Sequence, residues 1–223
     1  MKHDPANIII AVDGTAASGK GTLARRLAAD LAFAYLDTGK LYRLVGMQVL
    51  ADGGSLGNAD DAVAAVATIR RDFDPRSLEN KALLSDCAGD AASQVAAVPA
   101  VRAALLDLQR AFAAQPPDAA KGAVLDGRDI GTVICPDATL KLFIDAAMPI
   151  RAERRFKELQ SQGISVTYDA VLADMLERDQ RDSSRTVAPM KPADDAIIVD
   201  TSHLDADAVF EKARAFIREK CGL

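Results

Sequence analysis

The sequence predicts an α/β protein in which a parallel sheet is covered by helices on both faces. Residues Ile8 to Val12 form an apolar, β-branched run that ends at a glycine-rich loop, as expected for a strand buried on both faces. Leucines then recur every four residues, at 23, 27 and 31, which predicts a helix over residues 21–33. A strand, a glycine loop and a helix therefore open the chain.

Further apolar runs predict strands later in the chain. They are Ala123 to Leu125, Leu140 to Ile144 and Ala196 to Val199. An aspartate follows each run closely, namely Asp126, Asp145 and Asp200. Because strands alternate with helical segments, we expect one parallel sheet of five strands between two layers of helices.

The stretch between the first helix and the strand at Ala123 departs from this alternation, which predicts an insertion. Residues 52–58 form a glycine-rich loop, and residues 70–85 contain short strand-like pieces around Pro75. Residues 90–115 are helical with an interruption at Pro99, before a break at residues 115–118. We expect one domain over residues 1–223, with the insertion at residues 38–118.

Residues 150–186 are predicted to form a short helical lid, because charged side chains of both signs are dense there and arginines are frequent. Pro149 fits the first turn of one helix, and Gly163 fits its C-terminal end. A second helix is expected to turn four apolar side chains inward: Val171, Leu172, Met175 and Leu176.

Composition and charge exclude several classes of protein. A chain of 223 residues, 49% of them hydrophobic, is long enough to bury a full core. Its net charge of -5 disfavours binding to polyanions such as nucleic acids. No apolar run approaches the roughly 20 residues of a membrane span. Cys87, Cys135 and Cys221 are too widely spaced for a disulfide framework or a metal site. We expect a cytoplasmic monomer without nucleic-acid or membrane partners.

The glycine loop matches the phosphate-binding pattern G-x-x-x-x-G-K. Its residues are Gly14, Thr15, Ala16, Ala17, Ser18, Gly19, Lys20, Gly21 and Thr22. Glycines let successive N–H groups and the helix N-terminus face one phosphate group of a nucleotide. Lys20 can then reach oxygens of the β- and γ-phosphates. A mere turn would not explain a lysine at a helix start, where the helix dipole disfavours a cation unless an anion is present. The sequence predicts a P-loop three-layer fold.

A phosphate-binding loop is compatible with a switch, a motor or a transferase. Residues 86–89 fit the D-x-x-G pattern of guanine-nucleotide switches, but residues 80–83 lack the aspartate that would complete N-K-x-D. The numerous arginines instead suit a second anionic ligand and the charge of a phosphoryl group in transfer. These observations favour a transferase.

Several motifs beyond the loop resemble those of bacterial cytidylate kinases. In that family's order they are Leu36 to Arg43, Ala91 to Ala96 with Val101 and Arg102, Asp126 to Thr132, and Arg178 to Arg185 with Val187 to Pro189. The resemblance covers residues 8–217, and Gly-Lys-Gly-Thr at 19–22 is the form that these kinases use. It implies transfer of the γ-phosphoryl group of ATP to CMP or dCMP, giving CDP or dCDP and ADP, with Mg²⁺ as cofactor.

The resemblance also implies roles for individual residues. Residues 14–22 would hold the ATP phosphates, with the Thr22 hydroxyl on Mg²⁺. The acceptor phosphate would contact Thr38, Arg43, Arg128 and Arg185, although the family often has serine where Thr38 stands. Cytosine would be read by Ser93, Arg102 and Asp129, and the ribose by Arg178 and Asp182. The catalytic side chains would be Lys20, Arg128, Arg154, Arg155 and Arg185, with Arg151 on the same helix as the two lid arginines.

Two alternatives stay open. A kinase for another small nucleoside monophosphate would have the same loop, and the cytosine-reading residues argue against it. A nucleotide-binding module without turnover would have less need of dense arginines, which stabilise a phosphoryl group in transfer. Two nearby residues also keep two interpretations each: Asp37 binds substrate or caps the following turn, and Tyr42 stacks on a ligand or packs.

Overall fold

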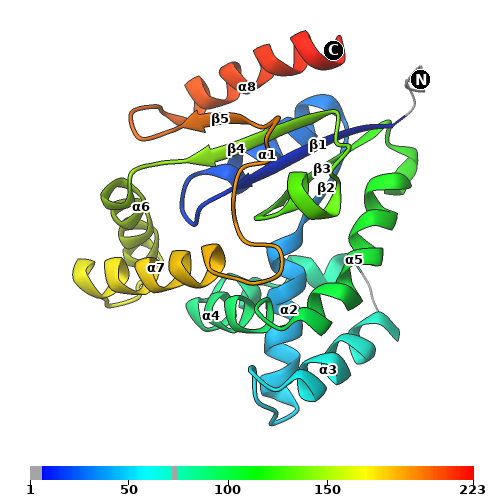
Figure 1. Ribbon diagram of the computed structural model, residues 1–223. Coiled ribbons are helices and arrows are strands. Elements are labelled where there is room, and N and C mark those ends of the chain that lie inside the picture. Colours follow the sequence, from blue (N-terminus) through cyan, green and yellow to red (C-terminus); the bar gives the residue numbers. More distant parts are fainter. Residues whose placement is uncertain (1–6, 72–74) are drawn as a thin grey trace. The chain divides into compact units, whose positions relative to one another are not determined.

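Figure 1 shows the computed structural model, which describes residues 7–71 and 75–223. The chain divides into two units. The sheet unit comprises Met1–Leu36 and Phe112–Leu223, and the helical unit comprises Asp37–Ala111. In sequence, the helical unit is therefore an excursion within the sheet unit.

The sheet has five strands in the order β2-β3-β1-β4-β5. They are β1 (Ile8–Gly14), β2 (Ala34–Asp37), β3 (Gly122–Gly127), β4 (Leu140–Asp145) and β5 (Ile197–Asp200). Strand β1 runs parallel to β3 and β4, and β4 runs parallel to β5. The predicted parallel α/β sheet is confirmed, and β2 is a strand that the sequence pattern did not locate.

One face of the sheet packs against α1 (Lys20–Leu31) and α8 (Ala206–Cys221). Alternate residues of the central strands, such as Ile10, Val12 and Leu142, fill this core. A π-helical segment, η4 (Ile130–Ile134), follows β3 and contacts β1. Its hydrogen bonds reach back five residues, from the Cys135 N–H to the Ile130 carbonyl at 2.7 Å.

Helices α6 (Met148–Ser161) and α7 (Tyr168–Ser183) follow β4 and lie side by side (Figure 1). Their apolar side chains share a small core, against which Ala16 and Ala17 pack. Pro149 lies in the first turn of α6, and Gly163, with φ of +76°, follows its end, as predicted. Val171 and Met175 are buried in this core. The expectation that Leu176 points inward is wrong, since it is 52% exposed at the edge of the buried stripe.

The helical unit contains α2 (Thr38–Ala51), α3 (Ala59–Arg71), α4 (Asp86–Val95) and α5 (Pro99–Ala114), whose last turn belongs to the sheet unit. A Cβ on Gly46 of α2 would lie 2.8 Å from that of Ala91 on α4, so the glycine permits close packing. The interruption at Pro99 is confirmed.

The strand-like pieces expected around Pro75 are wrong. Two 3-10 helices, η1 (Pro75–Glu79) and η2 (Lys81–Leu84), occupy the described part of that stretch, and residues 72–74 lie outside it. The Asn80 side chain accepts a hydrogen bond from the Ala82 N–H at 2.9 Å, so a local polar contact starts η2. A third 3-10 helix, η3 (Pro117–Ala119), marks the break before β3.

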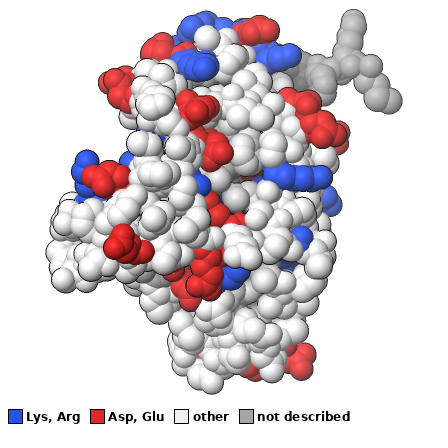
Figure 2. All heavy atoms as spheres, turned by 60° about the vertical axis from the view of Figure 1, so that its left-hand side comes forward, with Lys and Arg blue, Asp and Glu red and all other residues white. Residues whose placement is uncertain are grey.

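No single helix in the described ranges is long and apolar enough to cross a membrane, although the bent pair Cys87–Val95 and Pro99–Ala119 meets the length and composition limits together. Among the same residues, no three His, Cys, Asp or Glu side chains are grouped to hold a metal ion. No disulfide links the three cysteines, all of which lie in the described ranges. On the face that Figure 2 shows, acidic and basic side chains are interspersed, without a broad basic field.

Gly14→Ala is expected to destabilise the protein by about 3 kcal/mol or more, because a Cβ there would lie 1.9 Å from the Ile144 carbonyl oxygen and φ is +146°. Gly57→Ala is the control, since a Cβ at Gly57 meets nothing within 4 Å. Urea denaturation measures both free energies of unfolding. Equal stabilities of the two variants would contradict the close approach at Gly14.

Candidate active site

The glycine loop joins β1 to α1, as predicted, and its first residues are fastened to the end of β4. The Thr15 N–H donates to the Ile144 carbonyl at 3.3 Å, and the Thr15 hydroxyl donates to Oδ1 of Asp145 at 2.7 Å. Within the loop, the Ser18 hydroxyl donates to the Thr15 carbonyl at 2.9 Å. Gly19 takes a left-handed conformation, φ +91°, immediately before α1. The loop is therefore shaped by its own contacts and by β4.

Lys20 is the first residue of α1, and its ammonium lies between the loop and the end of β3. Its Nζ is 3.5 Å from the Thr15 carbonyl oxygen and 3.9 Å from Oδ1 of Asp126. Tyr35 on β2 donates its hydroxyl to Oδ2 of the same aspartate at 3.4 Å. A cation thus lies at the helix start with a carboxylate opposite, so the local charge is balanced without a bound anion.

Asp126 also explains a departure from the general phosphate-loop pattern, which has serine or threonine after the lysine. A Cβ on Gly21 would lie 3.0 Å from Oδ2 of Asp126, so a larger residue would meet that carboxylate. The apolar run before Asp126 predicts that this residue follows a strand, but it predicts no role for the carboxylate. The available signal was an aspartate at the carboxyl end of a parallel strand, the edge at which ligands bind in such sheets.

Asp182 on α7 brings together two of the arginines that the resemblance singled out. Its Oδ2 lies 2.9 Å from Nε of Arg128, and its Oδ1 pairs with Arg185. Burial acts to raise the pKa of the Asp182 carboxyl, but Arg128, Arg185 and Arg178 outweigh it and hold that pKa below its ordinary value. The carboxylate is 3% exposed, so an ionised Asp182 and its arginines form one buried charge cluster.

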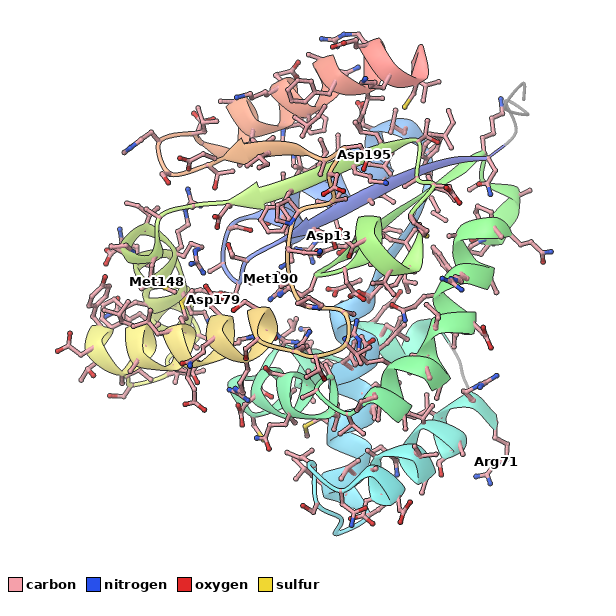
Figure 3. The ribbon with its side chains drawn as sticks, in the orientation of Figure 1. Asp13, Arg71, Met148, Asp179, Met190 and Asp195 are labelled. Atoms are coloured by element: carbon pink, nitrogen blue, oxygen red, sulfur yellow. The ribbon has the colours of Figure 1, made fainter. Side chains whose placement is uncertain are left out.

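Arg151 on α6 connects both helices to the phosphate loop. Its Nη1 lies 2.7 Å from Oδ2 of Asp179 on α7, which Figure 3 labels, and donates to the Ala16 carbonyl of the loop at 3.3 Å. Its Nε donates to the Ala146 carbonyl at 2.8 Å. These contacts use the guanidinium for structure, which the expected role of a lid arginine did not include.

Arg154 and Arg155 have different surroundings, although the resemblance gave them one role. Arg154 donates to the Thr201 hydroxyl and carbonyl, at 3.0 and 2.6 Å, and to the Ser18 carbonyl at 3.5 Å. Arg155 pairs with Glu158 of its own helix at 2.7 Å. Thr201, which also donates to the Ser18 carbonyl at 2.9 Å, is a contact that sequence reasoning missed.

Two more aspartates of the sheet unit are buried near Arg128. Asp129 directly follows it, is 4% exposed, and precedes η4. Asp13, the residue before the glycine loop, accepts the N–H groups of Ile130 and Gly131, each at 2.8 Å. Burial raises the pKa of the Asp13 carboxyl to about 7, with Asp129 and Asp126 adding to that effect and the two N–H groups opposing it.

The helical unit carries the other expected substrate residues. Thr38 begins α2, and both Thr38 and Ser93 of α4 are buried. Arg43 donates to the Leu83 carbonyl and, at 3.3 Å, to the Ser85 carbonyl. Asp37 caps α2 by accepting the Lys40 N–H at 3.2 Å, which favours the capping interpretation.

Arg102 and Tyr42 are also in contact within the helical unit. The Arg102 guanidinium carbon lies 5.5 Å from the centre of the Tyr42 ring, and its Nη1 donates to the Ala96 carbonyl at 3.4 Å. Tyr42 therefore packs against an arginine that the resemblance assigns to cytosine.

Asp182→Asn is expected to lower the free energy of unfolding by about 3 kcal/mol at neutral pH, because it leaves buried guanidinium groups without their anion. The depressed pKa means that this contribution is present above pH 3.8, the ordinary value, and is lost as the pH falls through the lowered pKa. The difference between variant and wild type should thus narrow in acid. Urea denaturation measures it.

The control for Asp182 is Glu177→Gln on the same helix. Glu177 lies 3.7 Å from Nε of Arg181 and is 71% exposed, so its loss should cost less than about 1 kcal/mol. Similar losses in the two variants would rule out a buried cluster that depends on Asp182.

Comparison with known proteins gives these motifs a family. Residues 10–219 match the family model for cytidylate kinase. The cytidylate kinase of Rhodospirillum rubrum is 57% identical over 213 residues, which cover 96% of this chain and 98% of that protein. That of Paramagnetospirillum magneticum is 58% identical over 212 residues, covering 95% and 98%.

Among solved structures, an uncharacterized protein from Eubacterium ventriosum shares the fold. Its TM-score is 0.53 at 16% identity, with 95% of this chain and 98% of that chain covered. The resemblance expected from the motifs is confirmed by the relatives of high identity and nearly full coverage. This chain belongs to the cytidylate kinase family.

Proposed function

We propose that this protein transfers the γ-phosphoryl group of ATP to CMP or dCMP, giving CDP or dCDP and ADP. The observation that carries the proposal is the phosphate loop, with Lys20 held 3.9 Å from Asp126, in a chain of the cytidylate kinase family. A nucleoside monophosphate has a second pKa of about 6, so its phosphate oxygen is already nucleophilic at neutral pH. Positioning and charge stabilisation, rather than a general base, are the tasks of the site.

ATP would place its phosphates against residues 14–22. The N–H groups of the loop and of the first turn of α1 would donate to the phosphate oxygens. The Lys20 ammonium would exchange its contact with Asp126 for the β and γ oxygens, and its charge would be needed most as the phosphoryl group moves. The Thr15 contact with Asp145 supports this role, because it ties the start of the loop to the end of β4.

Mg²⁺ fits the oxygen atoms beside the loop. Thr22 directly follows Gly21, and a Cβ on Gly21 would lie 3.0 Å from Oδ2 of Asp126, so the residue beside Thr22 approaches a carboxylate. Mg²⁺ usually keeps several waters and takes substrate phosphates as ligands, so one or two protein oxygens are enough to hold it. When bound, the ion would neutralise phosphate charge, with Thr22 as its protein ligand.

The acceptor phosphate would be held by Thr38, Arg43, Arg128 and Arg185. Arg128 and Arg185 already meet at Asp182, which supports their joint use. Arg178 and Asp182 would contact the ribose, and Ser93, Arg102 and Asp129 would read cytosine. The buried positions of Ser93, Arg102 and Asp129 support a reading role, since buried polar groups discriminate strongly against a ligand that leaves them unpaired.

The insertion at residues 38–118 would carry the monophosphate, and residues 150–186 would act as the lid. The separate helical unit, Asp37–Ala111, supports the first assignment. The contacts of Arg151 and Arg154 with the phosphate loop support the second, and Arg155 would join them at the transferred phosphoryl group. We propose that the protein acts as a monomer and that its only partners are these small substrates. A net charge of -5 disfavours binding to nucleic acid.

Adding CMP or dCMP to wild-type protein with ATP and Mg²⁺ should release ADP, and Lys20→Ala should lower that turnover by about 100-fold or more. The control is Lys157→Ala, which removes an exposed lysine paired with Glu153 on α6. A coupled assay measures ADP, and circular dichroism checks the fold. ATP binding without ADP release would indicate a binding module, and full turnover in a folded Lys20→Ala variant would remove Lys20 from the mechanism.

Asp129→Asn should narrow the preference for CMP over UMP. Cytosine presents an N4 donor where uracil presents an O4 acceptor, so a carboxylate accepts from the first and repels the second. An amide can donate to O4, and the ratio of kcat/KM values for CMP and UMP should fall by about 10-fold or more. If Asp129 only orients Arg128, both substrates lose the same factor and the ratio is unchanged.

A further inference from the structure

Asp13 is a buried carboxylate that the mechanism above does not use. It is the penultimate residue of β1, directly before Gly14, and it is 5% exposed. Its Oδ1 accepts the Ile130 N–H and its Oδ2 accepts the Gly131 N–H, each at 2.8 Å. Figure 3 labels Asp13 within the sheet. Both oxygens are therefore committed to the backbone of one segment.

That segment is the start of η4. The first N–H groups of a helical segment have no acceptor within it, and Asp13 supplies acceptors for two of them. The Asp129 carbonyl belongs to the same peptide group as the Ile130 N–H. It accepts hydrogen bonds from the N–H groups of Val133 and Ile134 at 2.9 and 3.2 Å. The backbone that follows Arg128 is thus fixed from two sides.

Gly131 lets the segment come close to the sheet. A Cβ there would lie 3.0 Å from Cδ of Lys141 on β4 and 3.4 Å from Oδ2 of Asp13. Ile130 beside it is fully buried. Because Gly131 has no side chain, its N–H can approach the Asp13 carboxylate closely.

We infer that Asp13 is a positioning residue, whose carboxylate fixes Arg128 and Asp129 to the strand that opens the phosphate loop. The residues proposed to hold ATP directly follow Asp13 along the chain, and Arg128 and Asp129 directly precede the two amides that it binds. One side chain thus links the phosphate loop to the Arg128 segment. The consequence for catalysis rests on the proposed function, whereas the two hydrogen bonds do not.

The charges around Asp13 make this contact sensitive to pH. Asp126 at the end of β3 and Asp129 after it are the anions that face Asp13, while the Lys141 ammonium on β4 lies 2.8 Å from Oδ1 of Asp195. Burial and the neighbouring carboxylates raise the pKa of Asp13 to about 7. Protonation converts one acceptor oxygen into a hydroxyl, so one of the two backbone bonds weakens as the pH falls through that value.

The first test follows the amide resonances of Ile130 and Gly131 by NMR, in wild-type protein between about pH 5.5 and 8.5. The chemical shifts of both amides should titrate together with a midpoint near pH 7, because the carboxyl group that accepts their hydrogen bonds gains or loses a proton there. Asp13→Asn should abolish that titration, and the control Asp195→Asn should keep it. Amides that do not move in wild-type protein, or that still titrate in Asp13→Asn, would overturn the contact.

The second test is the ratio of kcat/KM for CMP between wild type and Asp13→Asn across the same pH range. Titration of the CMP phosphate affects both enzymes and cancels in the ratio. The wild type should exceed the variant by about tenfold at the alkaline end, as one lost hydrogen bond implies, and the ratio should approach one toward the acid end. A loss that is equal at every pH would mean a purely structural role and overturn the proposal.

The two tests separate this inference from the proposed function. A wild-type protein without CMP kinase activity would overturn the proposed function, and the amide titration would still decide whether Asp13 binds η4. Active enzyme with a flat ratio would overturn the positioning role alone.

Discussion

Parallel strands end at the same edge of a sheet, and the rest of this site depends on that constraint. Strands β1, β3 and β4 each bring an aspartate to this edge: Asp13, Asp126 and Asp145. Each carboxylate contacts a different partner, namely the amides of η4, the ammonium of Lys20 and the hydroxyl of Thr15. The phosphate loop and the Arg128 segment are thereby fixed to neighbouring strands, whose spacing the sheet sets.

The arginines of the sheet unit require a second set of carboxylates, because a buried guanidinium without an anion is strongly unfavourable. Helix α7 supplies them three residues apart, with Asp179 at Arg151 and Asp182 at Arg128 and Arg185. Under the proposed function, a phosphate that enters must compete with Asp182 for two guanidinium groups. The competition lowers the gain on binding, but it keeps the arginines ordered in the absence of substrate, so less conformational entropy is lost when substrate arrives.

Local patterns predicted much of the fold because they depend on neighbouring residues. Such local patterns predicted three features: the strand from Ile8, the glycine loop and helix α1 with its regular leucine spacing. Strand β2 was not located, since Ala34–Asp37 has four residues and an edge position that demands no long apolar run. Around Pro75, turn-forming residues made 3-10 helices where short apolar pieces suggested strands.

In the site too, residues in local motifs could be predicted, whereas contacts between distant residues could not. The phosphate loop and the arginines lie in contiguous motifs, so sequence reasoning could name them as candidates. Thr201 could not be found in this way, because its partner Ser18 is 183 residues away and no local spacing encodes the contact. Asp145 was recognisable as a strand-end aspartate, but its bond to Thr15 depends on how β1 and β4 pair.

The contrast among the arginines of α6 shows what such long-range contacts add. Arg151 and Arg155 each lie against a carboxylate, Asp179 and Glu158 respectively. The hydrogen-bond acceptors of Arg154 are instead neutral oxygens of Thr201 and Ser18. These acceptors orient the guanidinium, and one of them, the Ser18 carbonyl, belongs to the phosphate loop itself. Under the proposed function, these contacts hold the Arg154 guanidinium beside the loop that would bind the phosphoryl group in transfer.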